Sequence, residues 1–104
     1  MNDTRNALAE LFERIPRRHS PDNVKEIYSI LDEYEGLLQT IEAESPVFEK
    51  QVAPFFDSLE PVRGLVKKSA DNKASKKMKD SFFDEASGSL KDSMQSVLEF
   101  YKPA

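Results

Sequence analysis

The side chain with the most obvious catalytic chemistry in this sequence is its single histidine, His19, because imidazole exchanges a proton near neutral pH. A phosphate-accepting histidine would lie on an exposed helix face, and a serine nucleophile would need His19 as its base. His19 instead lies between Arg18 and the dipeptide Ser20-Pro21, which indicates a solvated turn. The sequence therefore predicts no catalytic residue and no enzymatic activity.

Metal and cofactor chemistry lacks the ligand patterns that it needs. The absence of cysteine removes thiolate nucleophiles, disulfides and cysteine-based zinc sites. No Glu-x-x-His pair suits a di-iron site, and acidic pairs such as Asp32-Glu33 do not lie in a calcium-binding loop with oxygen ligands at alternate positions. The glycines are isolated, with no phosphate-binding loop after them. We therefore expect no metal and no cofactor.

A basic segment from Arg63 to Lys79 is the strongest charge feature. It holds seven basic residues and one acidic residue, a net charge of +6, whereas the whole chain carries −4. Clustered lysines bind polyanions by releasing counterions, which gives an alternative function in binding nucleic acid or another anionic surface. The anion-binding candidates are Lys67, Lys68, Lys73, Lys76, Lys77 and Lys79. Because the segment has no aromatic residue to stack on a base, we favour a solvated segment that complements acidic helices.

Two pairs of adjacent phenylalanines indicate an interaction surface. Neighbouring positions on a helix diverge by about 100°, so one ring of each pair points into the core and the other lies at the edge of the apolar stripe. Surplus apolar surface is typical of self-association or of a partner groove, although a kinked third helix that covers all four rings is an equal alternative. The interface candidates are Phe55, Phe56, Phe82, Phe83, Ile30 and Leu37.

Helical periodicity in four stretches must position these groups, and no stretch alternates as a β-strand would. The expected helices cover residues 4–15, 21–44, 46–69 and 73–101. Ser20-Pro21 and Ser45-Pro46 start the second and third helices, because a serine hydroxyl caps the first turn and proline suits its first position. Pro54 and Pro61 interrupt the third helix, which we expect to be kinked or segmented and not a straight rod.

The second and fourth stretches carry apolar heptads and are expected to supply the longest seams. The apolar stripe of the second is wider than one neighbour covers, which indicates a central helix. Its other side carries a small residue at every seventh position, namely Ser29, Gly36 and Ala43. These residues form either a groove for a closely packed backbone or, as we favour, an exposed stripe. The fourth helix is expected to start after Asp71 or Asn72 and to continue through Gly88.

Length and composition complete the prediction. The chain has 104 residues, 38% hydrophobic and 33% charged, which suits one domain over 1–104. It has no signal peptide and no apolar run long enough to cross a bilayer, so we expect a cytoplasmic protein. The sequence predicts an all-α fold, a small antiparallel four-helix bundle with a proline-kinked third helix. Its expected function is a non-enzymatic protein–protein interaction module, an adaptor, regulator or small assembly subunit that binds a protein partner or forms a homodimer.

Overall fold

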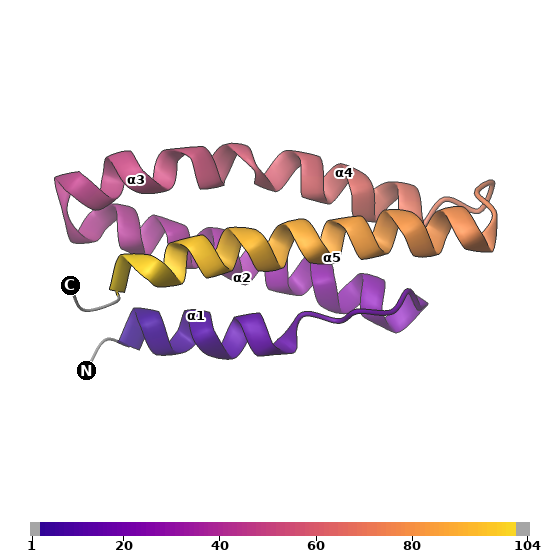
Figure 1. The fold of residues 1–104 in the computed structure, drawn as a ribbon, viewed down its shortest axis with the longest axis horizontal. Helices are drawn as coiled ribbons and strands as arrows, with labels where there is room; N and C mark the ends of the chain where they lie inside the picture. Colours follow the sequence, from indigo (N-terminus) through magenta and orange to yellow (C-terminus); the bar gives the residue numbers. More distant parts are fainter. Residues whose placement is uncertain (1–2, 102–104) are drawn as a thin grey trace.

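Helices supply all the regular structure of this chain in the residues that the computed structural model describes, 3–101. The all-α class is therefore confirmed. The elements are α1 (Asp3–Arg14), α2 (Pro21–Glu44), α3 (Pro46–Asp57), α4 (Leu59–Ser69), α5 (Lys76–Leu98) and a short 3₁₀ helix, η1 (Glu99–Tyr101). Together they form an elongated body of 45 × 22 × 21 Å (Figure 1).

The chain reverses direction between α1 and α2, between α2 and α3, and between α4 and α5, so the helices of each of these pairs lie side by side (Figure 1). α1 packs against α2 and α5, α3 and α4 pack against α2, and α4 packs against α5. α3 and α4 follow one another along the same side of the molecule (Figure 1). The α1–α2 and α4–α5 connections consequently lie at one end of the long axis, and the α2–α3 connection lies at the other.

Serine caps fix the starts of α2 and α3, as the sequence predicts. The Oγ of Ser20 accepts a hydrogen bond from the backbone N–H of Asn23 at 3.0 Å, and the Oγ of Ser45 accepts one from the N–H of Phe48 at 3.1 Å. In both helices proline occupies the first turn. Each cap satisfies an N–H that has no partner inside the helix, so these two boundaries are encoded locally.

The start of the last helix differs from the expectation. α5 begins three residues later than predicted, because the Oγ of Ser75, and not the side chain of Asp71 or Asn72, accepts from the first turn, at 3.2 Å from the N–H of Met78. Asp71 instead accepts a hydrogen bond from the N–H of Lys73 at 2.9 Å and stabilises the α4–α5 connection. Because the side chain of Asp71 accepts a hydrogen bond within the connection, it does not cap the first turn of α5.

The expected third helix over 46–69 consists of two helices that meet at Ser58. Pro54 is accommodated inside α3, at an exposed position. Pro61 has no N–H to bond the carbonyl of Asp57, the last residue of α3, and its ring crowds that carbonyl. Regular helix therefore stops after Asp57 and resumes at Leu59. The interruption is real, but it lies between the two prolines and not at either of them.

The α1–α2 connection is held against α5. Ile15, the expected last residue of the first helix, lies just beyond α1 and is only 5% exposed. The hydroxyl of the buried Ser87 on α5 donates to the carbonyl oxygen of Pro16 at 2.8 Å. The ring of His19 packs edge-on against Phe83, with 5.7 Å between centroids. The expectation of a solvated His19 is therefore wrong, since 16% of its side chain is exposed.

The core is one apolar cluster to which α2 and α5 contribute the most residues. α2 supplies Ile27, Ile30, Leu31, Tyr34, Leu38 and Ile41, and α5 supplies Phe83, Ala86, Leu90, Met94 and Val97. Full burial of a large aliphatic side chain contributes roughly 1.5–3 kcal/mol. The two heptad patterns therefore mark the helices that stabilise the molecule most.

A polar bridge crosses this core from α2 to α5. The hydroxyls of Tyr34 and Ser93 lie 2.6 Å apart, and Tyr34 is fully buried. Burial disfavours the phenolate and raises the pKa of Tyr34 to about 12, an effect that the hydrogen bond to Ser93 opposes. The folded protein therefore binds the phenolic proton more tightly than the unfolded chain does.

We expect Tyr34 to make the protein less stable at alkaline pH. Its contribution is fully present below the unfolded pKa of ~10 and is lost as the pH rises through the folded value of about 12. Between these two pH values urea unfolding should show a loss of stability that is about 2 kcal/mol larger in the wild type than in Tyr34→Phe, which retains the raised pKa of Tyr101. Identical pH slopes for the two proteins would contradict this assignment.

The glycines lie inside helices and face open space. A Cβ atom built at Gly36, Gly64 or Gly88 meets no atom within 4 Å. α5 continues through Gly88, as expected. Gly36 and its heptad neighbours Ser29 and Ala43 are exposed, so no backbone of the described chain packs closely on this stripe. Within residues 3–101 the stripe is therefore exposed, and a groove for the backbone of another molecule stays a prediction.

Replacing Gly36 with alanine should raise the free energy of unfolding by about 1 kcal/mol, because glycine inside a helix costs that much and the new methyl group has room. The matched control is Ala43→Gly, one heptad further along the same exposed side of α2, which should lower stability by a similar amount. Urea denaturation measures both. A loss of stability in Gly36→Ala would show that another chain occupies this space.

Candidate functional site

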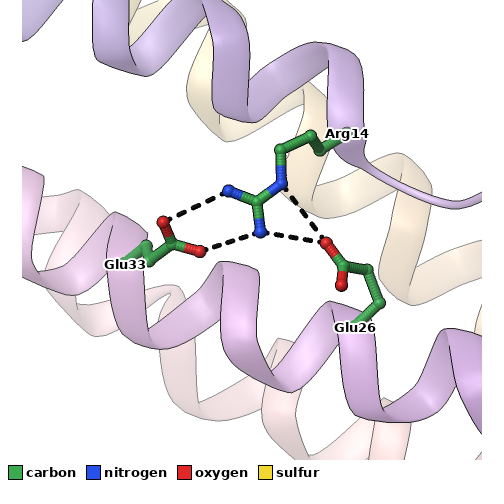
Figure 2. Close-up of polar contacts among 3 residues, drawn as sticks. All are labelled: Arg14, Glu26 and Glu33. Carbon is green, nitrogen blue, oxygen red and sulfur yellow. Dashed lines mark hydrogen bonds and ion pairs between the residues drawn. The ribbon is translucent and has the colours of Figure 1, made fainter.

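A cleft of about 370 Å³ between α1 and α2 contains Arg14, whose charge is paired within the molecule. Its Nη1 and Nη2 donate to the two carboxylate oxygens of Glu33 at 3.2 and 2.9 Å. Its Nε and Nη2 donate to Oε1 of Glu26 at 3.3 and 2.9 Å (Figure 2). Hydrogen bonding to Glu33, and then to Glu26, raises the pKa of Arg14. The guanidinium thus clamps α1 to α2, which gives the cleft a structural role.

Arg14→Met should lower the free energy of unfolding by about 1 kcal/mol or less, because the Arg14 side chain is 39% exposed and water screens the pairs. The loss should shrink in about 1 M salt. Lys50→Met on α3, which removes a charge that is not in an ion pair within residues 3–101, should show no salt-sensitive change. A loss that is the same at low and high salt would instead assign the effect to packing of the arginine stem.

Arg63 also forms ion pairs within the molecule, so it does not act together with the other cations of the basic segment. Its Nη2 lies 3.1 Å from Oδ1 of Asp32 and 3.5 Å from Oε1 of Glu35, both on α2. The side chain of Arg63 is 25% exposed. This interaction ties α4 to α2, as the Arg14 clamp ties α1 to α2.

The six candidate lysines surround the α4–α5 connection and have no carboxylate partner. They are Lys67 and Lys68 in the last turn of α4, Lys73 in the connection, and Lys76, Lys77 and Lys79 at the start of α5. Within residues 3–101 none of them forms an ion pair. The ammonium of Lys68 lies 5.7 Å from the centroid of the Phe82 ring. The structure therefore places all six around one connection and pairs none of them directly with a carboxylate within residues 3–101.

Three cations that the sequence analysis missed join these lysines: Arg17, Arg18 and Lys25. Arg17 and Arg18 lie in the α1–α2 connection and line a cleft of about 460 Å³ together with Lys76. Lys25, near the start of α2, lines a cleft of about 310 Å³ together with Lys79. The sequence could have predicted that the two connections lie close together. When the helices on either side of each connection run in opposite directions, the first and third connections lie at the same end of the molecule.

We call these nine cations and their surroundings the basic end of the molecule. Residues 17–25 and 67–79 hold nine basic and two acidic residues, a net charge of +7. The remainder of the chain holds six basic and seventeen acidic residues, a net charge of −11. Both segments flank the connections at the same end of the long axis (Figure 1). Charge is therefore segregated in space and not only in sequence.

The interface candidates are less exposed than the sequence suggests. Ile30 and Phe83 are fully buried in the core, so their assignment to an interface is wrong. The other candidates are half-buried and pack against the core: Phe55, Phe56, Phe82 and Leu37. In the described part of the chain the exposed large apolar side chains are Val47 and Met78, at 62% and 50%. Surplus apolar surface is therefore limited to ring edges and these two residues.

Further chemistry is not evident in the part of the chain that the structure describes. No three potential metal-ligating side chains gather there, and none of its helices combines the length and apolar character required to span a bilayer. No model of a protein family, no curated protein and no solved structure matches the chain. The basic end is therefore the feature from which a function can be inferred.

Proposed function

We propose that this chain is a non-enzymatic interaction module that docks its basic end onto an acidic surface of a partner protein. The architecture that we propose is an antiparallel four-helix bundle, with α3 and α4 as the two segments of its kinked third helix. The observation that carries the proposal is the gathering of nine cations, from segments distant in sequence, at one end of an otherwise acidic molecule. Within residues 3–101 none of the nine has a carboxylate partner.

The position of three of these lysines is unfavourable for stability. Lys76, Lys77 and Lys79 lie at the N-terminal end of α5, whose first turn has no acidic residue. The positive end of a helix dipole favours anions, with an effect of about 0.3–1 kcal/mol for each exposed charge. Cations placed there reduce the stability of the free protein, and an anionic partner would remove that cost. Their placement therefore supports a role in binding.

An acidic protein is a better match for this end than nucleic acid is. Phe82 is half-buried with the ammonium of Lys68 over its ring, so this face of the ring is not free to stack on a base. The end is about 22 Å across, so an extended polyanion would also meet the acidic remainder of the rod. Met78, which is half exposed between Lys77 and Lys79, adds a flexible apolar contact of the kind that protein partners use.

A second copy of the chain is the alternative partner, and one observation favours it. Val47 is 62% exposed beside the half-buried Phe48, whose ring stacks on Phe100 at 5.6 Å between centroids. These groups lie near the α2–α3 connection, away from the basic end (Figure 1). Sedimentation velocity tests self-association. A dimer that dissociates in Val47→Asp would support this apolar homodimer, and a strictly monomeric wild type would contradict it.

The basic end should bind a fluorescent polyglutamate peptide with an affinity that falls as salt increases. Replacing all six lysines of the α4–α5 region by glutamine should weaken binding at least tenfold, or about 1.4 kcal/mol. A pair of singly substituted proteins provides a match in charge. Lys73→Gln should weaken binding, whereas Lys50→Gln, on α3 and outside the basic end, should leave it unchanged. Fluorescence anisotropy measures each affinity.

Two results would overturn the proposal. Equal affinities for the Lys73→Gln and Lys50→Gln proteins would show that the peptide senses overall charge and not the basic end. Tighter binding of a DNA or RNA duplex than of the peptide at the same salt would favour the nucleic-acid alternative.

A further inference from the structure

The cleft of about 310 Å³ at the basic end differs from its neighbours in the charges that line it. It lies between the start of α2, the end of α4 and the start of α5. Lys25 comes from α2, Lys79 from α5 and Asn72 from the α4–α5 connection, and no acidic side chain lines it. The adjacent cleft, by contrast, includes Asp80 and Asp84 in its wall. Two carboxylates therefore line the second of these clefts and none lines the first.

Three side chains of this cleft, Lys25, Lys79 and Asn72, can donate to a ligand, whereas His19 faces Asp80 at 3.9 Å. Neither Lys25 nor Lys79 forms an ion pair within residues 3–101. The amide of Asn72 adds two N–H donors. The hydroxyl of Ser69, which also lines the cleft, donates to the carbonyl of Val66 at 2.6 Å and is occupied. Two ammonium groups and an amide suit a dianion with several acceptor oxygens, which describes a phosphate monoester better than a carboxylate.

The size and the walls of the cleft indicate what carries the phosphate. A volume of about 310 Å³ lies at the lower limit for small-ligand pockets and exceeds by about tenfold the ~30 Å³ that a water molecule occupies. Inorganic phosphate alone would leave much of this space to water. Pro21, Val24 and Ala70 line the rest with apolar surface. A phosphate on a short hydrocarbon stem fits both parts of the cleft.

We propose that this cleft binds the phosphate group of a phosphorylated serine or threonine side chain on the acidic partner. The inference rests on the proposed function, because the surrounding cations of the basic end hold the acidic flanks of the same segment. Lys25 and Lys79 pair with the phosphate oxygens, Asn72 donates to them, and the side-chain stem lies against Val24. Arg17, Arg18 and the remaining lysines contribute to affinity without selecting the phosphate.

The test compares three forms of one acidic peptide, with serine, phosphoserine or glutamate at its centre, by fluorescence anisotropy at constant salt. The phosphoserine peptide should bind at least tenfold more tightly than the serine peptide. The glutamate peptide should gain less than threefold, because one carboxylate supplies a single charge and a different geometry. Equal gains from phosphoserine and glutamate would overturn the phosphate site.

A matched pair of variants locates the effect. Lys25→Gln with Lys79→Gln and Lys67→Gln with Lys68→Gln each remove two charges from the basic end, but only the first pair lines the cleft. Both proteins should lose a similar factor for the serine peptide. The tenfold preference for phosphoserine should persist in the second protein and fall below threefold in the first. Circular dichroism confirms that both are folded, and persistence of the preference in the first protein would overturn the assignment.

The remaining outcomes separate this site from the proposed function. Serine-peptide binding with no gain from phosphorylation would overturn the cleft and leave the docking function standing, whereas failure of all three peptides would overturn both. Free phosphoserine and inorganic phosphate serve as competitors. If either displaces the phosphopeptide at a concentration equal to that of the peptide, the site is for a small phosphorylated molecule and not for a partner's side chain. Tighter binding to vesicles that contain phosphatidic acid would likewise overturn the protein partner.

Discussion

The structure depends on covering an apolar stripe of α2 that is wider than one neighbouring helix. α1 packs on one side of α2, α3 and α4 pack on another, and Tyr34 reaches across the core to Ser93 on α5. α1 has only 12 residues, so it cannot cover the whole length of α5, and the α1–α2 connection covers the rest through Ile15 and Pro16. The same burial that stabilises the core therefore fixes Arg17 and Arg18 beside the start of α5.

Sequence reasoning succeeded where a boundary or a face is decided within a few residues. The starts of α2 and α3 follow from Ser20 and Ser45, each of which caps its own first turn, and the buried faces of α2 and α5 follow from their heptads. It failed where two local signals compete. Asp71 resembles a helix cap, but it bonds the N–H of Lys73 in the connection and leaves the cap to Ser75. Two nearby prolines likewise made the position of the break at Ser58 ambiguous.

The sequence predicts only those residues of the candidate site that are neighbours in the chain. Six of its cations form a run in the sequence, so composition alone identifies them. Their union with Arg17, Arg18 and Lys25 is a contact between segments about fifty residues apart in the chain, which no local pattern encodes but which alternating helix directions imply. Arg63 lies next to this run in the sequence but does not belong to the site, because it forms ion pairs with Asp32 and Glu35 on α2. A charged segment therefore predicts a binding site only after the residues that form ion pairs within the molecule have been excluded.

Screening explains why a protein of net charge −4 presents a cationic site. At physiological ionic strength the Debye length is ~8 Å, far below the 45 Å length of this molecule. An anion at the basic end therefore responds more to the cations there than to the acidic residues farther along the molecule, although Asp80 and Asp84 line one of the clefts at this end. The advantage declines along the rod, because an anion that extends beyond the end begins to meet acidic residues. Such a field selects a short anionic segment with its charge concentrated at one point, and a phosphorylated side chain is the densest such charge that a polypeptide carries.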